Sequence, residues 1–377
     1  MKILFICGAL EPGKDGVGDY TRRLAGAVQS LGHESTIIAL YDSWVGETTV
    51  AAQLAENDII QVLRIASNTS DRHRYRRAKE WVDAFDPTWI SLQFVPYAFN
   101  PKGLPFSLAG ELRALLVNDR HLHIMFHEIW VGPAKRIDWK RWLTSALQQK
   151  IISRLINSLQ PAMVHTQLPL AQHNLQSIKK DIHPLPLFSN IDFFNQPVQP
   201  ANQVLRVGFF SQATASRPII TFLEELYTNA VKDGRKIELL FIGGNPARMK
   251  AAGEMLKTRA CFKDNIFFTG FLPAEGISAA LQQCSLGITQ VPRHALGKSG
   301  SVAAFLHHGI PVAAPVVQQG KHPKDIGFFS ENLCAAVLLT PDIQALDIAK
   351  EAVIKAKHEI DLKAIAKLFI EGINNRQ

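Results

Sequence analysis

The sequence lacks the patterns that mark secreted, membrane-spanning and metal-binding proteins. Its 377 residues include four cysteines, none of them in a CxxC or other metal-ligand spacing. These are Cys7, Cys261, Cys284 and Cys334, and we expect them to be buried thiols in a reducing cytoplasm. No apolar run reaches about 18 residues, so no transmembrane helix is predicted. The apolar run in residues 1–8 is short and lacks a small-residue cleavage site, which predicts a first strand and not a signal peptide.

Two nucleotide-binding motifs are also missing. The loop at residues 8–18 does not contain GxGxxG, so a dinucleotide-binding fingerprint is not supported. Gly297-Lys298-Ser299 resembles the end of a P-loop, but Pro292 stands where that motif needs its first glycine. No zinc-finger, RNP or helix-turn-helix signature is present, and we do not expect nucleic acid as a partner.

The histidines do not predict a metal site. His127-Glu128 would begin an HExxH zinc motif, but the second histidine of that motif is replaced by Val131. His121, His123 and His127 follow the alternation of a strand, and the sequence indicates no carboxylate partner for them. We therefore expect no bound metal.

Length and charge point to a two-domain protein with an anionic partner. A hydrophobic fraction of 47% with 20% charged residues is ordinary for a globular protein, and 377 residues suffice for two cores. Lysine and arginine number 41 against 33 acidic residues, which gives a net charge of +8. A nucleotide, a phosphorylated acceptor or a membrane surface would complement this charge.

Strands and helices alternate along the chain, which predicts two α/β sheets. A strand, a glycine-containing loop, a helix at residues 19–31 ended by Gly32 and a second strand open the first sheet. The turn-rich stretch 190–203 is the predicted linker. Further strands are predicted at 59–63, 89–94, 123–126, 162–165, 204–210, 237–242 and 266–269, with helices at 72–85, 106–117, 139–159, 219–231, 248–257 and 274–282.

The segment 288–315 carries the clearest ligand-binding signal. It predicts a strand, a glycine turn at 297–300, a helix at 301–308 stopped by Gly309, and a second strand. Lys298, Ser299 and Ser301 at the start of this helix would add a cation and hydroxyls to free backbone N–H groups, a combination that suits a diphosphate. The alternative is an ordinary capped helix with a solvated Lys298.

Several stretches resemble one family. Residues 16–25 and 31–33 look like the opening of GT-B glycosyltransferases of family 4, and residues 268–272, 286–289 and 308–312 are similar to their nucleotide-sugar domain. The resemblance covers nearly the whole chain.

The resemblance implies an α/β fold of two Rossmann-like, doubly wound domains that face each other across a cleft. Residues 1–195 would form the acceptor domain, 196–360 the nucleotide-sugar donor domain, and 361–377 a C-terminal helix that can cross back to the first domain. The implied reaction is a retaining transfer from a nucleotide-sugar donor to a hydroxyl of a saccharide or lipid-linked acceptor, with no metal or cofactor. From the residues alone, two unrelated sheets in tandem are the alternative.

This sequence departs from the family at the donor site. The two glutamates of the family's EX7E pattern fall on Leu296 and Ala304, which leaves the donor sugar undetermined. Gln212 occupies the place of the family's diphosphate-binding arginine, and Arg217 lies near the place of its lysine. We expect Lys298 to supply the missing charge.

The candidate site residues combine both lines of reasoning. By resemblance, His127 lies beside the donor sugar, whereas from the residues alone a strand-end histidine is the better supported reading. Asp19 is predicted as the N-cap of the first helix, as a contact to the acceptor hydroxyl, or as both. Gly243-Gly244 forms either a tight turn or a close approach to the donor. The catalytic candidates are His127, Asp19 and Lys298, and the donor-binding candidates are Gly16, Val17, Gly18, Ser211, Gln212, Arg217, Gly243, Gly244, Gly270, Phe271, Leu272, Lys298, Ser299, Gly300 and Ser301.

Two basic stretches, residues 72–79 and 135–142, suit an anionic membrane interface or a lipid-linked acceptor, with Trp139 and Trp142 interleaved among lysine and arginine. The alternative is a pair of solvated helix faces with the tryptophans in the core.

The predicted function is a cytoplasmic glycosyltransferase, at the inner face of the membrane if the basic stretches bind lipid, in polysaccharide or glycolipid assembly. The alternatives are a non-catalytic nucleotide-sugar-binding or scaffold protein, and a nucleotide-sugar epimerase of the same fold.

Overall fold

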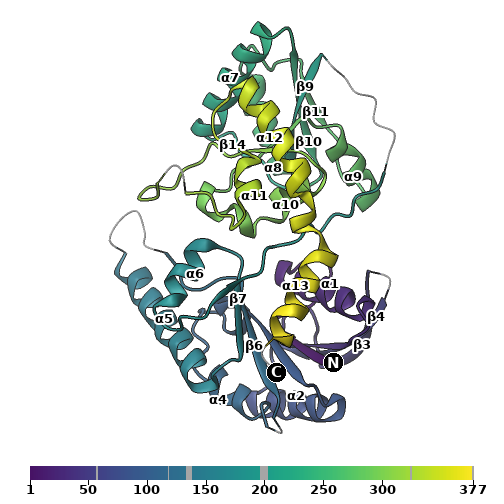
Figure 1. The fold of residues 1–377 in the computed structure, drawn as a ribbon, viewed down its shortest axis with the longest axis vertical. Coiled ribbons are helices and arrows are strands. Elements are labelled where there is room, and N and C mark those ends of the chain that lie inside the picture. The colour runs from purple at the N-terminus through teal and green to yellow at the C-terminus, as the bar shows by residue number, and fades with distance from the viewer. Residues whose placement is uncertain (57, 118, 133–137, 196–202, 323–324, 376–377) are drawn as a thin grey trace. The chain divides into compact units, whose positions relative to one another are not determined.

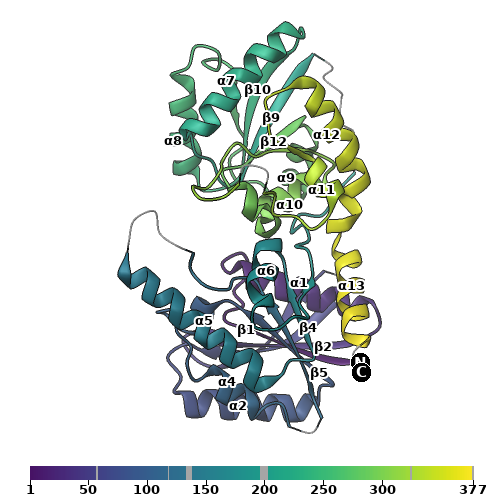
Figure 2. The same cartoon turned by 60° about the vertical axis from the view of Figure 1, so that its left-hand side comes forward.

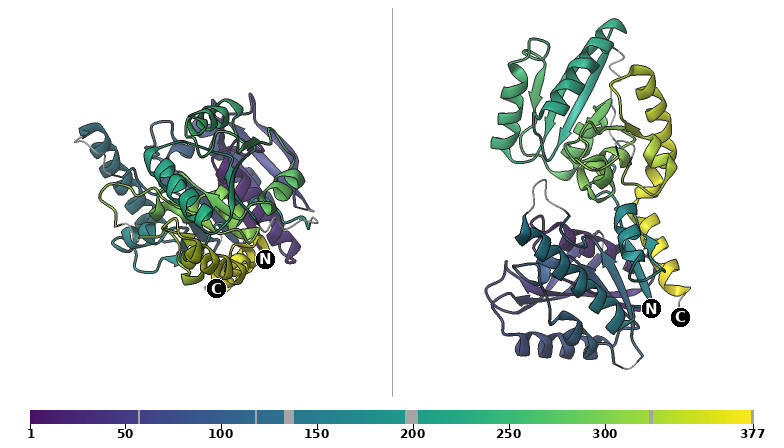
Figure 3. Two further views of the ribbon diagram at one scale, coloured as in Figure 1. Left: turned by 90° about the horizontal axis from the view of Figure 1, so that it is seen from above. Right: turned by 90° about the vertical axis from the view of Figure 1, so that its left-hand side faces the viewer.

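The computed structural model describes residues 1–56, 58–117, 119–132, 138–195, 203–322 and 325–375 (Figure 1). The chain divides into two compact units. Unit 1 comprises Met1–Leu185 and Leu362–Gln377, and unit 2 comprises Pro186–Asp361. Each unit is built on one sheet with helices on both faces (Figures 2 and 3).

The chain enters unit 2 ten residues before the predicted boundary at 195/196. The described part of the predicted linker is already bound to unit 2, since the Phe194 N–H donates to the Ser278 hydroxyl and the Gln282 amide donates to the Phe194 carbonyl. The described residues of this turn-rich stretch are thus part of unit 2. Residues 196–202 of that stretch lie outside the described residues.

The sheet of unit 1 has the order β3-β4-β2-β1-β5-β6-β7-β8, and β3 is antiparallel to its neighbour β4 while the other described pairs are parallel. Strands with both faces covered have continuous apolar runs, as in β1. The strands are β1 (Lys2–Cys7), β2 (Glu34–Asp42), β3 (Thr49–Ala55), β4 (Asp58–Ala66), β5 (Trp89–Phe94), β6 (His121–Phe126), β7 (Met163–Thr166) and β8 (His183–Pro184).

Helices cover both faces of this sheet. Alternation along β1 sends Leu4 and Ile6 to the face packed by α2, α4 and α5, while Phe5 meets Phe369 of α13 on the other face, with 5.8 Å between ring centroids. The C-terminal helix α13 therefore belongs to unit 1, where it lies against α1 (Figures 1 and 2). The helices of unit 1 are α1 (Gly16–Ser30), α2 (Asp71–Phe85), α3 (Pro96–Phe99), α4 (Leu108–Arg113), α5 (Trp139–Leu159), α6 (Pro169–Gln176) and α13 (Leu362–Asn374).

The sheet of unit 2 is parallel throughout its described pairs, with the order β11-β10-β9-β12-β13-β14. Its strands are β9 (Val204–Phe210), β10 (Lys236–Ile242), β11 (Ile266–Phe268), β12 (Leu286–Ile288), β13 (Val312–Ala313) and β14 (Val337–Leu338). Its helices are α7 (Arg217–Lys232), α8 (Pro246–Lys257), α9 (Ala274–Gln282), α10 (Gly300–His307), α11 (Glu331–Ala335) and α12 (Ile343–Ala356), with 3₁₀ turns η1 (Arg293–Lys298) and η2 (Lys357–Ile360).

Two apolar layers flank the sheet of unit 2. Figure 2 shows α7 and α8 on one side, and α9, α10 and α11 on the other. Phe305 of α10 packs closely against β12, since a Cβ on Gly287 would stand only 2.6 Å from its ring. Glycine at this position therefore sets how closely α10, the helix of the predicted anion site, packs on the sheet.

Candidate functional site

The strand order of unit 1 reverses beside β1, since β2 lies on one side of it and β5 on the other. The carboxyl ends of the strands at such a reversal are where open α/β sheets bind ligands. The segments after β1 and β5 touch here, because a Cβ on Gly8 would lie 2.6 Å from the Ala98 carbonyl oxygen. The start of α1 and His127, which follows β6, lie at this same edge of the sheet.

The first helix begins earlier than predicted, and Asp15 caps it. Asp15 has an extended backbone, and its carboxylate accepts from the Gly18 N–H at 2.6 Å. The prediction of Asp19 as N-cap is wrong: Asp19 lies in the first turn, where it accepts from the Gly13 N–H at 3.1 Å and pairs with Arg22. The glycine-rich sequence was interpreted as a loop because glycine disfavours helices, but the cap and the tertiary packing prevail.

Gly18, at the start of α1, is required for packing within unit 1. A Cβ on Gly18 would lie 2.5 Å from the Ala9 carbonyl oxygen, so the close approach predicted for a phosphate is made to the protein's own backbone. Gly16 faces open space, and Val17 lies beside it in the first turn. Asp15 and Asp19 already place two carboxylates at this helix N-terminus, which makes it an unfavourable site for a diphosphate.

His127 is a buried, neutral hydrogen-bonding group. Its Nε2 lies 2.9 Å from the Gln93 side-chain oxygen, and its ring meets the Tyr20 ring edge-on at 4.8 Å between centroids. Burial lowers the pKa of His127 to about 3, so the imidazole carries no charge at neutral pH. It therefore cannot offset phosphate charge, but it can exchange a hydrogen bond with a sugar hydroxyl.

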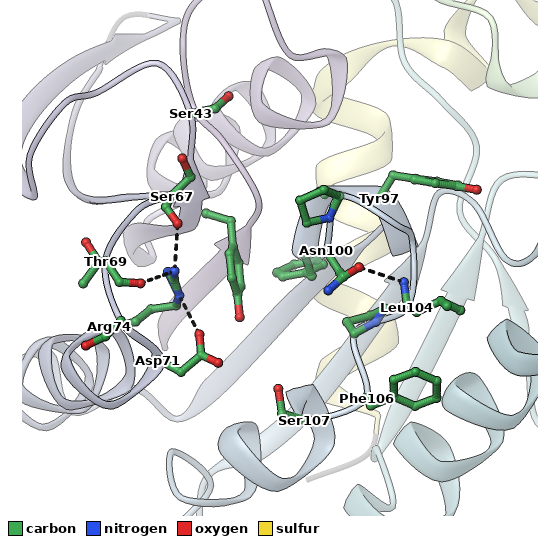
Figure 4. Close-up of a pocket in the computed structure, with 16 residues that line it drawn as sticks. Ser43, Ser67, Thr69, Asp71, Arg74, Tyr97, Asn100, Leu104, Phe106 and Ser107 are labelled. Atoms are coloured by element: carbon green, nitrogen blue, oxygen red, sulfur yellow. Dashed lines mark hydrogen bonds and ion pairs between the residues drawn. The ribbon is translucent and has the colours of Figure 1, made fainter. Parts of the chain in front are cut away.

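A pocket of about 890 Å³ opens in unit 1 near the carboxyl ends of β2 and β4 (Figure 4). Arg74 of α2 lies at its base and is only 2% exposed, with its guanidinium 3.9 Å from the centre of the Tyr41 ring. It donates to the backbone oxygens of Ser67 and Thr69, while its Nε has no hydrogen bond to a described residue and lies 3.6 Å from Asp71.

Hydroxyl groups and aromatic rings make up much of the remaining lining. Among the described residues that line the pocket, Arg74 is the one basic residue and Asp71 the one acidic residue, so their formal charges balance. The side chains that offer hydroxyl, amide or ring surface are Tyr41, Ser43, Ser67, Thr69, Ser70, Tyr97, Asn100, Phe106 and Ser107. Such a lining suits a neutral, polyhydroxylated ligand.

In unit 2 the strand order reverses beside β9, which lies between β10 and β12. Three contacts join the segments that leave the carboxyl ends of neighbouring strands. The Gly243 N–H donates to the Thr269 hydroxyl at 3.2 Å, and a Cβ on Gly244 would lie 2.3 Å from the Ser211 carbonyl oxygen. Gln212 accepts from the Gln290 amide at 2.7 Å across the reversal itself.

These contacts bring four of the predicted donor-binding residues of unit 2 to one edge of its sheet: Ser211, Gln212, Gly243 and Gly244. Ser211, with a φ of 65°, and three glycines, Gly243, Gly244 and Gly270, all have positive φ angles. Each of these residues lies in a tight turn shortly after a strand. Phe271, beyond Gly270, is 93% exposed. Leu272 instead packs against the apolar cluster beneath α10, which indicates a structural role. Arg217 is exposed at the first position of α7.

The predicted anion segment forms a capped helix. The Ser299 hydroxyl accepts from the Val302 N–H at 3.4 Å and lies 3.1 Å from the Ser301 hydroxyl. α10 starts at Gly300, one residue earlier than predicted, and Gly309 follows it with a φ of 74°. Lys298 ends η1 and is exposed, so its ammonium group and the N-terminus of α10 share one surface of unit 2.

Leu296 and Ala304, the positions on which the resemblance places two glutamates, are buried. Leu296 and Ala304 lie in the apolar cluster between α10 and the sheet, with exposed fractions of 1% and 0%. A carboxylate at either position would be desolvated without a charged partner, at a cost of several kcal/mol. The apolar residues are thus consistent with the packing around them.

Several site residues were missed from the sequence, among them Gln93, Gln167 and Gln290 and the residues that line the pocket of unit 1. Gln167 is the first residue after β7, is 4% exposed, and its amide nitrogen has no hydrogen bond to a described residue. Gln290 lies two residues after β12, and Gln93 is the penultimate residue of β5. A polar residue at or just after the end of an apolar strand is the signal that would have found these three glutamines.

The basic stretches differ from each other. In residues 72–79, Arg74 is buried, and Arg77 and Lys79 pair with Glu80 and Asp83 at 2.6 and 2.5 Å, so this stretch is a helix face and not a free basic patch. In residues 135–142, positions 135–137 lie outside the described residues. Trp139 and Trp142 are 64% and 71% exposed, so the alternative that places them in the core is wrong.

Within the described ranges, no helix is long and apolar enough to span a bilayer, and no three His, Cys, Asp or Glu side chains cluster as metal ligands would. The thiols of Cys7 and Cys284 are buried as predicted, and burial raises the pKa of Cys284 to about 12. The prediction is wrong for Cys261 and Cys334, which are only half-buried.

No protein-family model and no curated protein sequence matches this chain. Solved structures do match it. HepE from Anabaena, solved in complex with UDP, aligns with a TM-score of 0.61 at 14% identity over 100% of both chains. The fold is GT-B. Sucrose-phosphate synthase from Thermosynechococcus elongatus aligns with a TM-score of 0.60 at 14% identity over 100% of this chain and 98% of its own.

A putative UDP-N-acetylglucosamine 2-epimerase from Listeria monocytogenes is also similar, with a TM-score of 0.50 at 14% identity over 99% of this chain and 96% of its own. The GT-B fold therefore hosts more than one activity among the proteins that resemble this chain.

Proposed function

We propose that this protein is a glycosyltransferase that moves a sugar from a nucleotide-sugar donor to a hydroxyl acceptor. The observation that carries the proposal is the edge of the sheet in unit 2, where Ser211, Gln212, Gly243, Gly244 and Gln290 converge at the reversal of strand order. Ligands of open α/β sheets bind at this place. The similar fold of HepE, solved with UDP, supports a uridine or related nucleotide.

The donor diphosphate is proposed to bind at the N-terminus of α10. Lys298, Ser299, Gly300 and Ser301 combine an ammonium group, two hydroxyls and the first backbone N–H groups of a helix, although the Val302 N–H is already capped by the Ser299 hydroxyl. Stabilising the leaving diphosphate in this way needs no metal, and by resemblance to the family the transfer is retaining. Gln212 contributes no charge, so more of the stabilisation falls to Lys298.

The acceptor is proposed to be a saccharide bound in the pocket of unit 1. Balanced charge at Arg74 and Asp71 disfavours an ionic ligand, while Tyr97 and Phe106, each about half exposed, offer ring faces to a sugar. Replacing both rings by alanine is expected to raise the acceptor KM about tenfold and leave donor hydrolysis unchanged. Leu54→Ala, an exposed apolar residue on β3, is the control and should change neither.

The start of α5 is proposed to contact an anionic membrane, as polysaccharide or glycolipid assembly at the inner face of the membrane would require. Exposed Trp139 and Trp142 flank exposed Lys140 and Arg141, a composition typical of the membrane interface. The double variant Trp139→Ala, Trp142→Ala should lose co-sedimentation with anionic liposomes at low salt. Equal sedimentation of both proteins, or none by the wild type, would remove this part of the proposal.

Release of free nucleotide from UDP-, GDP- and dTDP-sugars tests the activity. The proposal predicts slow donor hydrolysis that accelerates with a suitable saccharide acceptor. The buried, apolar Leu296 and Ala304 favour a second candidate, a protein that binds nucleotide sugars without turnover, and donor binding without nucleotide release would support it. An isomerised donor would point to an epimerase, in line with the similarity to the Listeria protein.

A further inference from the structure

A row of polar side chains crosses the buried sheet of unit 1 beneath α13. Ser91 and Gln93 lie on β5, His123 on β6 and His165 on β7, with exposed fractions from 0% to 3%. Phe369 of α13 covers His123, with 5.1 Å between ring centroids. Burying four polar groups in one parallel sheet costs free energy unless they form hydrogen bonds with one another. None of the four is a proposed contact of the donor or the acceptor.

The four residues form one hydrogen-bonded chain that ends at His127. The Gln93 amide nitrogen donates to the Ser91 hydroxyl at 2.8 Å, and Ser91 lies 2.8 Å from His123 Nδ1. His123 Nε2 in turn lies 3.0 Å from His165 Nδ1. At its other end, Gln93 accepts from His127 Nε2 through its side-chain oxygen.

The chemistry of each group fixes the direction of this chain. The Ser91 oxygen accepts from the amide, so its single hydrogen goes to His123 Nδ1. His123 is then protonated on Nε2 and donates to His165. Burial lowers the pKa of His165 to about 3 and that of His123 well below its ordinary value, so neither ring supplies a second proton near neutral pH.

We propose that Gln93 is a positioning residue: its side-chain oxygen holds His127 in the Nε2–H tautomer and leaves Nδ1 as a hydrogen-bond acceptor, while its amide nitrogen sets the direction of the bonds through Ser91 and His123. His127 would then select a substrate group that donates a hydrogen bond, such as a sugar hydroxyl, over a phosphate oxygen. Phe126 pairs with Thr166, so His127 and Gln167 leave adjacent strands side by side. The Gln167 side chain also interacts with the His127 imidazole, and its buried amide nitrogen, which has no hydrogen bond to a described residue, is a donor from which the same hydroxyl can accept. The assignment of the substrate group rests on the proposed function, whereas the hydrogen-bonded chain does not.

Nuclear magnetic resonance of the full-length protein labelled with ¹⁵N-histidine tests the direction of the hydrogen bonds from His127 to His165. In the wild type, His123 and His127 should both be neutral Nε2–H tautomers from pH 5 to 8, assigned by single His→Gln variants. The Gln93→Glu variant should reverse the chain, because a carboxylate accepts from both His127 and Ser91. The Ser91 oxygen then accepts, and His123 should become the Nδ1–H tautomer.

A second substitution and a matched control separate a change of tautomer from a loss of folding. Ser91→Ala removes a single hydroxyl and should leave His127 in the Nε2–H form while His123 becomes a mixture of tautomers. Gln148→Glu is the matched control, because Gln148 is an equally buried glutamine of unit 1 whose bonds go to the backbone at Val131 and Gly103. Unchanged tautomers in both Gln93→Glu and Ser91→Ala, or a wild-type His127 protonated on Nδ1, would overturn the proposal.

The pH dependence of donor hydrolysis gives the functional readout. The wild-type rate should be independent of His127 protonation from pH 5 to 8. In Gln93→Glu the carboxylate stabilises the imidazolium, so the rate should fall about tenfold as the pH drops below about 6.5, while Gln148→Glu keeps the wild-type profile. The expected tautomers without any nucleotide release would refute the proposed function alone. Nucleotide release with the same pH profile in Gln93→Glu and wild type would refute the role of Gln93 alone.

Discussion

The buried histidines of unit 1 should make its stability fall steeply in mild acid, and His165→Gln should reduce that dependence. In the folded protein, burial lowers the pKa of His127 and His165 to about 3, whereas a histidine of the unfolded chain titrates near about 6.5. The unfolded chain therefore takes up protons below pH 6.5 that the folded chain excludes. Stability is fully present above the unfolded pKa and is lost as the pH falls below it.

The magnitude follows from linkage. Each such histidine lowers the free energy of unfolding by about 1.4 kcal/mol per pH unit between its two pKa values. From pH 6.5 to pH 5 one residue accounts for about 2 kcal/mol. His165 is 3% exposed, so solvent screening is slight. Replacing it by glutamine removes the titration and keeps an acceptor for His123.

Tryptophan fluorescence during urea unfolding reports the stability of unit 1, the unit that contains His165. All six tryptophans lie between positions 44 and 142, so the signal follows unit 1 alone. The slope of the free energy of unfolding against pH, between pH 5 and 6.5, should be about 1.4 kcal/mol per unit smaller in His165→Gln than in wild type. His173→Gln removes an exposed histidine of α6 and should leave the slope as it is. Equal slopes in all three proteins would refute the reasoning.

Three further predictions concern the caps and contacts of the site. Asp15→Ala should lower the free energy of unfolding by about 1 kcal/mol, because the Gly18 N–H loses its cap, whereas an equal loss in Asp19→Ala alone would contradict the assignment. Gly287→Ala should cost about 1–3 kcal/mol by forcing α10 off the sheet, and a neutral result would show that Phe305 relaxes freely. Lys298→Ala should raise the donor KM or lower kcat by about tenfold, with Lys321→Ala as the control, and wild-type kinetics would reject the diphosphate site.

Periodicity predicted the fold well because parallel strands covered on both faces leave unmistakable apolar runs. The strands at 89–94, 204–210 and 237–242 match β5, β9 and β10 within one residue. β3 was missed, since it is a half-exposed antiparallel strand at the sheet edge with a weak alternating pattern. The start of α1 was misplaced for a similar reason, because the packing of Gly18 on Ala9 is a tertiary contact that local propensity does not reveal.

The candidate site was predictable only in part. Residues that follow strands, such as Ser211 and Gly243, were found because parallel strands bring their carboxyl ends to one edge. The burial of Arg74 was not predicted, because a basic residue within a basic stretch is expected to be exposed to solvent, and the sequence does not reveal the pocket that buries it. The charge state of His127 was equally hidden, because it depends on burial among residues distant in sequence.

Hydrogen–deuterium exchange of the full chain with and without UDP tests the central claim most directly. We expect slower exchange in unit 2 at the segments after β9, β10 and β11 and at residues 298–302, where the backbone N–H groups of α10 would bind the diphosphate. UDP that leaves these segments unchanged, or that protects only unit 1, would contradict a nucleotide site at this edge of the sheet.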